Sequence, residues 1–126
     1  MIYETRTYRL KPRSVPEFVS TFGKAYEKRL RLSKLSAFFV TEIGPLNEVI
    51  HIWPYKDAAE REKKRIKSTQ DKKYSWPPKI GHLLENMQSE TFVPSPMTPT
   101  FAKGNKGPIF ESVSYTHLTL PTILLV

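Results

Sequence analysis

Residues 36–61 read "SAFFVTEIGPLNEVIHIWPYKDAAER", and this stretch decides the fold. Its first part, 38–43, is rich in β-forming residues. Residues 44–47 follow with turn chemistry, and residues 48–55 are strand-like again. The stretch therefore predicts a β-hairpin. Alternation along its second arm directs Ile50 and Ile52 to one face and puts four other side chains on the opposite face: Val49, His51, Trp53 and Tyr55.

Upstream of the hairpin, residues 2–10 have strand composition and a helix follows them. Ser14 and Glu17 have the spacing of a capping box, in which each side chain bonds the other residue's amide. Apolar residues then recur at three- and four-residue steps, which predicts an amphipathic helix: Val15, Phe18, Val19, Phe22, Ala25, Tyr26 and Leu30.

Downstream, a second capping box from Asp57 to Glu60 begins a highly charged helix that we expect to end near Thr69. We expect a short helical segment over 79–86 and a last strand over 87–93. The order β-α-β-β-α-β is the split βαβ arrangement, so the sequence predicts an α+β, ferredoxin-like domain over residues 1–98.

In such a domain both helices cover one face of the sheet, and the other face meets solvent or a partner. We place Glu4, Arg6 and large aromatic side chains at candidate positions on this open face, and infer that something covers them. The sequence thereby predicts a homodimer with the two sheets face to face.

Composition narrows the function classes. The chain has 126 residues, no cysteine and a formal net charge of +8. The absence of cysteine excludes disulfides, thiolate nucleophiles and Cys-ligated metals. Basic residues concentrate in 24–34 and 56–79 without a nucleic-acid motif, so we interpret them as solvated helix faces and expect no nucleic-acid partner. No apolar run reaches membrane-spanning length and no targeting segment is visible, which favours the cytoplasm.

Three motifs together resemble the NIPSNAP domain, from residue 1 to about residue 98. They are I-Y-E-x-R-x-Y-x-L-K-P at 2–12, G-P-L-N at 44–47 and H-x-W-x-Y-x-D-x-x-x-R at 51–61. Arg13 departs from the glycine that usually follows Lys-Pro in the family, which bears on the turn into the first helix.

The resemblance implies a dimeric α+β barrel, the assembly that the open-face argument reaches independently. It implies little about activity: family members are linked to vesicular transport and, in animals, to mitochondria. Mitochondrial localisation is therefore the alternative to the cytoplasm. Structural relatives in the wider superfamily include cofactor-free monooxygenases and haem enzymes, which is a likeness of fold alone.

NIPSNAP proteins often carry two tandem domains, and residues 109–115, "IFESVSY", echo residues 2–8, "IYETRTY". We interpret 99–108 as a linker and 109–111 as the beginning of a second repeat. The string "SVSYTHLTLPT" after it is similar to translated adapter sequence, so we expect artefact from there to residue 126. The uncontaminated transcript beyond Glu111 would test this interpretation.

Two alternating trios are the candidate site: Glu4, Arg6 and Tyr8 on the first strand, and His51, Trp53 and Tyr55 on the third. If these strands are neighbours, the trios can line one cavity under the sheet. Glu4 or His51 is then a candidate catalytic base, Arg6 a partner for an anion and Trp53 a platform for a flat ligand. The alternative is that the same residues only pair and pack. The three histidines lack metal-ligand spacing, and we expect no metal and no cofactor.

Two functions remain open from the sequence. One is a non-catalytic dimerising domain that binds a protein partner or a small hydrophobic ligand. The other is a cofactor-free enzyme, of the monooxygenase or isomerase type, that uses the cavity under the sheet.

Overall fold

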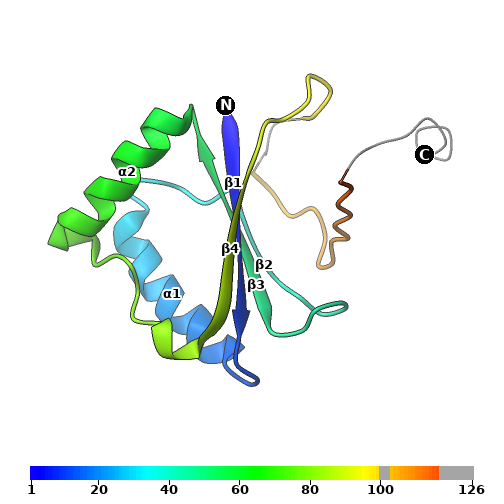
Figure 1. The fold of residues 1–126 in the computed structure, drawn as a ribbon, viewed down its shortest axis with the longest axis horizontal. Coiled ribbons are helices and arrows are strands. Elements are labelled where there is room, and N and C mark those ends of the chain that lie inside the picture. Colours follow the sequence, from blue (N-terminus) through cyan, green and yellow to red (C-terminus); the bar gives the residue numbers. More distant parts are fainter. Residues whose placement is uncertain (100–102, 117–126) are drawn as a thin grey trace, which may run out of the picture.

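The computed structural model describes residues 1–99 and 103–116 of the chain. Six main elements follow one another, with two short 3-10 turns, η1 and η2, before the last strand (Figure 1). In chain order, the six elements and the two turns are β1 (Ile2–Leu10), α1 (Val15–Arg29), β2 (Ala37–Val40), β3 (Glu48–Tyr55), α2 (Ala58–Gln70), η1 (Lys72–Tyr74), η2 (Gly81–Leu83) and β4 (Leu84–Phe92).

The four strands form one antiparallel sheet in the order β2-β3-β1-β4, and both helices lie on the same side of it (Figure 1). This arrangement confirms the predicted α+β, ferredoxin-like fold. It also makes β1 and β3 the two central strands. In their register Glu4 lies opposite Trp53, and Arg6 lies opposite His51. The two candidate trios therefore share one face of the sheet.

That face is the one under the helices, so our placement of Glu4, Arg6 and the aromatic side chains on the open face is wrong. The helix α2 makes the burial of a charged residue possible, because Arg61 and Arg65 reach down to the Glu4 carboxylate. We inferred a dimer because we expected these residues on the open face, so that argument for a dimer no longer holds.

The open face has a different composition. Its central part is made of half-buried residues from the three strands β1, β3 and β2: Tyr3, Thr5, Thr7, Ile50, Ile52 and Phe39. Exposed polar residues of β4, such as Gln88 and Glu90, complete it.

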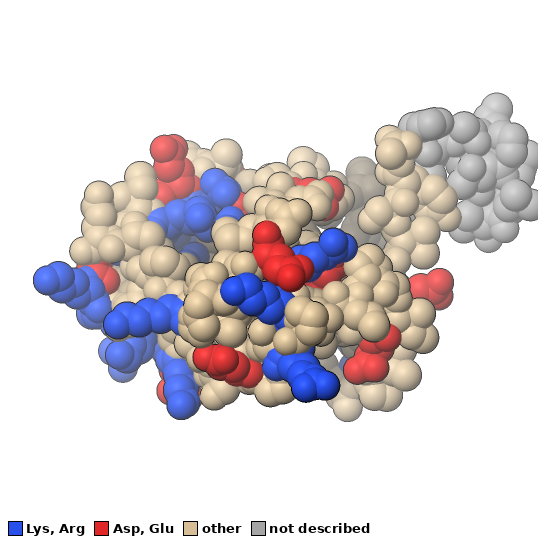
Figure 2. All heavy atoms as spheres, turned by 60° about the horizontal axis from the view of Figure 1, so that its bottom comes forward, with Lys and Arg blue, Asp and Glu red and all other residues tan. Residues whose placement is uncertain are grey.

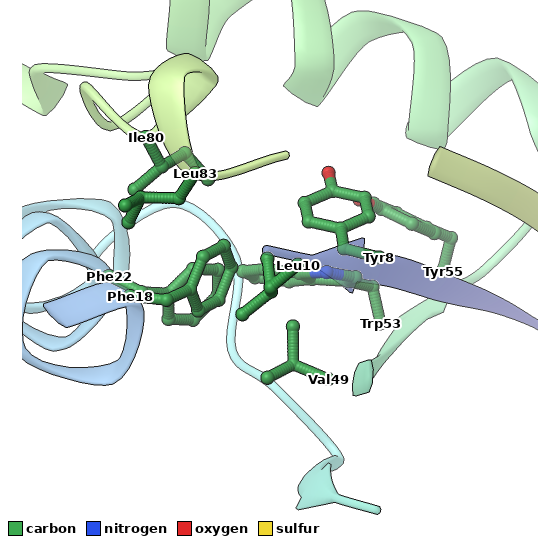
Figure 3. Close-up of a cluster of buried hydrophobic side chains, with 9 residues drawn as sticks. All are labelled: Tyr8, Leu10, Phe18, Phe22, Val49, Trp53, Tyr55, Ile80 and Leu83. Carbon is green, nitrogen blue, oxygen red and sulfur yellow. The ribbon is translucent and has the colours of Figure 1, made fainter. Parts of the chain in front are cut away.

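The core fills the space between the sheet and the helices (Figure 3). Phe18 and Phe22 point from α1 toward the sheet, as their spacing predicted, and their rings are 5.6 Å apart. The other buried members come from β1, from β3 and from the segment before β4: Tyr8, Leu10, Val49, Trp53, Tyr55, Ile80 and Leu83. Burying such side chains contributes about 1.5–3 kcal/mol each, which fixes α1 over the central strands.

One capping box is confirmed in part, with its returning bond shifted by one residue, and the other is wrong. The carboxylate of Asp57 accepts the amide of Glu60 at 2.8 Å, and the Glu60 carboxylate reaches back to the amide of Lys56. The Ser14 hydroxyl makes no cap bond, because its backbone is already helical rather than extended. Pro16 in the first turn and the carbonyl of Ser14 begin α1 instead.

The predicted helical segment over 79–86 is correct only for residues 81–83. Only the single 3-10 turn η2 forms there, and the chain is extended from Leu84, which pairs with Leu10 of β1. The pairing with a central strand outweighs the weak helical spacing of three apolar residues in this segment.

Residues 103–116 contain no helix or strand and lie on the side of the sheet away from the helices (Figure 1). Here the ring of Phe110 packs against Phe39 of the open face, with centroids 5.2 Å apart. Residues 117–126, which include His117 and most of the suspected artefact, lie outside the described residues. The interpretation of this segment stays a prediction, as do the domain boundaries.

None of the helices in the described part of the chain has the length and apolar character needed to cross a bilayer.

Arg13, which stands where the sequence pattern of the family usually has glycine, leads to a prediction about stability. Arg13 has a φ of 67°, in the left-handed region where a side chain costs about 1–2 kcal/mol and glycine is at ease. We expect Arg13→Gly to raise the free energy of unfolding by about 0.5–1 kcal/mol, because the relief exceeds the entropy that glycine adds to the unfolded chain. Urea unfolding measures this change. Arg13→Ala is the matched control and should give no comparable gain, since alanine keeps the unfavourable backbone. Equal gains from both substitutions would contradict a backbone cause.

Candidate functional site

A pocket of about 310 Å³ lies between the helix-covered face of the sheet, the two helices and the loop before β4. Its wall combines aromatic and aliphatic side chains with a few polar ones: Arg6, Tyr8, Phe22, Arg29, His51, Trp53, Arg65, Ser68, Thr69, Trp76, Pro77, Pro78, Ile80, Gly81, Leu84 and Met87. A larger hollow of about 630 Å³ runs along the outer side of α2, but it is lined only by residues of that helix and Asp71, so no groups converge on it from other elements.

Four of the six predicted site residues line the pocket, namely Arg6, Tyr8, His51 and Trp53. Glu4 and Tyr55 are fully buried nearby and are not part of its wall. The structure thus brings the predicted residues together, while their roles stay predictions.

Glu4 is the centre of a buried ion cluster. One carboxylate oxygen accepts hydrogen bonds from Arg61 Nε and from the hydroxyl of Ser89, and the other lies 3.6 Å from Arg6 Nη1 and 3.7 Å from Arg65 Nη1. Burial alone would raise the pKa of Glu4, but the Arg61 hydrogen bond and the three guanidinium charges outweigh it, and the pKa is lowered. A carboxylate that is held ionised with a lowered pKa by three arginines is a poor candidate for a catalytic base.

His51 is buried and neutral. Its Nδ1 accepts a hydrogen bond of 2.7 Å from Trp53 Nε1, which places the ring proton on Nε2. Burial first, and then the charges of Arg6, Arg29 and Arg65, lower the pKa of His51 to about 3. Nε2 has no hydrogen-bond partner among the described residues. The ring therefore carries a buried, unpaired N–H donor, and His51 is one of the residues that line the pocket.

Arg29 is the most unusual side chain of the site. It stands at the end of α1 with 1% of its surface exposed, and its guanidinium lies between two indole rings, 4.5 Å from the Trp53 centroid and 4.3 Å from that of Trp76. Its Nη1 donates to the Ser68 hydroxyl at 3.3 Å. Burial is the largest influence on the pKa of Arg29 and lowers it. Arg29 forms no ion pair within the described part of the chain.

Sequence reasoning missed Arg29 because we counted it with the solvated basic face of the first helix. A signal was present: Arg29 follows Phe22 by seven residues and Tyr26 by three, so it falls on the apolar stripe. Arg65 and Trp76 were also missed. We interpreted Arg65 as part of a solvated helix face.

The remaining basic residues follow our interpretation more closely. Figure 2 shows Lys and Arg side chains projecting at the left, the side on which both helices lie in Figure 1, with carboxylates between them. Lys24 and Lys28 of α1, and Lys63 and Lys67 of α2, are exposed. Among the described residues, no three His, Asp or Glu side chains are grouped closely enough to hold a metal ion.

Comparison with known proteins places this fold and pocket in context. The sequence profile of the NIPSNAP family matches residues 3–99. A NipSnap homologue from Dictyostelium discoideum is 31% identical over 96 residues, which are 74% of this chain and 42% of that protein. The chain thus spans less than half the length of this relative.

Solved structures give the same family and a wider likeness of fold. A NIPSNAP domain protein from Burkholderia xenovorans is 28% identical with a TM-score of 0.74, over 79% of this chain and all of that one. The structure of an antibiotic biosynthesis monooxygenase has a TM-score of 0.57 over 76% of this chain and all of that one, at 15% identity. At that identity the likeness extends to the fold only.

The buried neutral state of His51 predicts a specific pH dependence. The pKa of His51 is about 3 in the folded protein and 6.5 for the free side chain, so below pH 6.5 the unfolded chain takes up a proton that the folded protein excludes. This histidine should therefore lower the free energy of unfolding by up to about 1.4 kcal/mol per pH unit between pH 6.5 and 5. His51→Gln should remove that part of the slope in urea unfolding.

The matched control is His82→Gln. His82 is exposed and contacts Glu17, so its loss leaves His51 and the slope in place. Glu4 does not interfere, because its stabilising contribution is lost only as the pH falls below the ordinary Glu value of 4.5. An unchanged slope in His51→Gln would show that His51 takes up protons equally in both states.

Proposed function

The chain belongs to the NIPSNAP family, and we propose that its domain is a binding module that holds a small organic ligand in the pocket between the sheet and the two helices. One observation carries the proposal: His51, whose buried Nε2–H has no partner among the described residues, lies in a mostly aromatic and aliphatic wall that also holds three arginines. Apolar pockets with a few converging polar groups are the usual form of small-molecule sites. A buried donor without a partner also costs free energy that a ligand acceptor can recover.

The second candidate function is a cofactor-free enzyme of the monooxygenase or isomerase type. The pocket and the place of His51 in its wall favour it. The electrostatics disfavour it, because a general base works best with a pKa near the working pH. The pKa of His51 is about 3, and Glu4, which lies outside the wall of the pocket, is held ionised by its arginine partners. We therefore rank binding above catalysis.

We also propose that the domain forms a homodimer through its open sheet face. The support no longer comes from Glu4 and Arg6. An apolar strip lies in the centre of this face and is made of Ile50, Ile52 and Phe39. The ring of Phe39 already packs against an aromatic ring, that of Phe110. A protein partner at the same face is the alternative occupant.

Three further proposals rest on the sequence and the family. Residues 109–111 begin a second repeat, and artefactual sequence follows it. The protein acts in the cytoplasm or, as the family resemblance implies, at mitochondria or vesicles. Its full activity belongs to a longer protein, since the relatives extend well beyond the matched region.

The pocket proposal predicts that small ring compounds bind next to the indoles. Trp53 and Trp76 are the two tryptophans of the chain and both line the pocket, so intrinsic fluorescence reports on it directly. In a set of ring carboxylates, amides and alcohols, we expect the best compound to shift tryptophan emission with a dissociation constant of about 10 μM to 1 mM.

Thr69→Phe should weaken this binding by narrowing the pocket. Lys67→Phe is the matched control, because it adds the same ring to the same helix outside the pocket wall. Emission that no compound shifts, or equal shifts in Thr69→Phe, would refute binding at this pocket. Chemical turnover of a bound compound would favour the enzyme instead.

The dimer proposal predicts a mass near twice 14.6 kDa for the full chain in light scattering. Ile52→Lys should give monomers, because a charge in the centre of a packed interface is not solvated. Val19→Lys is the control: Val19 is similarly apolar and 41% exposed, but it lies on α1. A strictly monomeric wild type at high concentration would overturn the proposal.

A further inference from the structure

We propose that the pocket selects small organic carboxylates, with the carboxylate bound among Arg29, Arg6, Arg65 and the Nε2–H of His51 and with a compact ring or branched body against the two tryptophans. This inference rests on the proposed ligand-binding function and names the chemical class of its ligand.

The first support is a charge imbalance. Arg6, Arg29 and Arg65 line the pocket, and Arg61 is next to them, so four guanidinium groups meet here. In the part of the chain that the structure describes, Glu4 is the one carboxylate that forms an ion pair with any of these arginines. The cluster thus keeps a surplus of positive charge in a half-closed, largely apolar space, where charge is poorly screened.

The second support is the state of Arg29. A buried guanidinium without a carboxylate counter-ion is costly, and the stacked indoles with the hydroxyls of Ser68 and Tyr55 offset only part of that cost. Its Nε is buried without a hydrogen-bond partner among the described residues. An anion in the pocket would supply the missing charge, and the planar fork of arginine matches the two oxygens of a carboxylate.

The third support is the direction of the hydrogen bonds. His51 Nδ1 is already occupied by Trp53, so the ring can only donate to a ligand. The guanidinium groups have no acceptor atom either. Charged arginine donors beside a neutral histidine donor favour a ligand oxygen that carries negative charge. A neutral amide of the same shape satisfies fewer of them and leaves the charge surplus unchanged.

The size of the pocket limits the rest of the ligand. About 310 Å³ is at the small end of ligand sites, which suits a single ring or a short branched chain. Phe22, Ile80 and Leu84 complete the apolar wall beside the two indoles.

The experiment compares cyclohexanecarboxylate with cyclohexanecarboxamide, which differ at the polar group but share the body and do not absorb with tryptophan. Titrated into the full chain at pH 7 and low salt, the carboxylate should shift tryptophan emission with an affinity about tenfold higher than the amide. Added sodium chloride should reduce that ratio by competing for the positive charge.

Arg29→Met should weaken carboxylate binding by about tenfold and change amide binding by less than about twofold. Arg31→Met is the matched control, because Arg31 is exposed two residues further along the chain, past the end of α1, and it should change neither. Circular dichroism verifies the fold. Arg65→Met is the second variant and should also weaken the carboxylate alone, since its side chain is 35% exposed and its loss leaves the core intact.

The possible outcomes distinguish carboxylate selectivity from ligand binding by the pocket. Equal affinities for the two probes, or loss of amide binding together with carboxylate binding in Arg29→Met, would overturn carboxylate selectivity while a ligand pocket remains. If neither probe shifts the emission of the wild-type chain, carboxylate selectivity is refuted together with the use of this pocket for ring compounds.

Discussion

The arrangement of the helix layer depends on the buried carboxylate of Glu4. A charged group with no exposed surface is tolerated only when it is fully paired, and its partners come from three elements: Arg6 of β1, Arg61 and Arg65 of α2, and Ser89 of β4. Arg61 and Arg65 are one helical turn apart, so both can face Glu4 only when α2 lies over the central strands at one rotation about its axis. The same rotation brings Ser68 to the pocket. The ion cluster thus positions one wall of the site and contributes Arg6 and Arg65 to it, while Glu4 itself lies outside the wall.

The pairing of Glu4 leaves positive charge without a counter-ion on the pocket side of the ion cluster. One carboxylate cannot neutralise several guanidinium groups, and the remaining positive charge reaches the pocket, where it helps to lower the pKa of His51. The aromatic side chains make that surplus tolerable: two indoles stack on Arg29, and Trp53 also fixes the tautomer of His51 through its N–H. Trp53 therefore has three structural roles. It packs in the core, covers a cation and orients a donor.

The fold followed from the sequence because its decisive signals are local. The alternation of β3, the turn at 44–47 and the Asp57 capping box each act within a few residues, and together they restrict the topology. The face assignment of β1 did not follow. A strand that alternates Glu4, Arg6 and Tyr8 has no plainly apolar side, and only the arginines of α2, almost sixty residues away, decide which side is buried. Arg29 shows the same difficulty. Its spacing placed it on the apolar stripe of α1, but its charge indicated solvent, and the two indoles that reverse that preference come from distant segments.

The site composition also bears on how binding and catalysis can be distinguished in this fold. Arg6, Arg29, Arg65 and His51 offer donors to the pocket, and the nearby carboxylate is already paired. Donors alone stabilise negative charge but remove no proton and attack no carbon. A reaction here would need a substrate that brings its own base, or one that is already anionic and reactive. In the absence of such a substrate, the same donors and the same surplus charge only hold an anion in place. The ligand therefore determines which chemistry the pocket can perform. The identity of the ligand, more than the protein fold, decides whether this domain is a binding module or an enzyme.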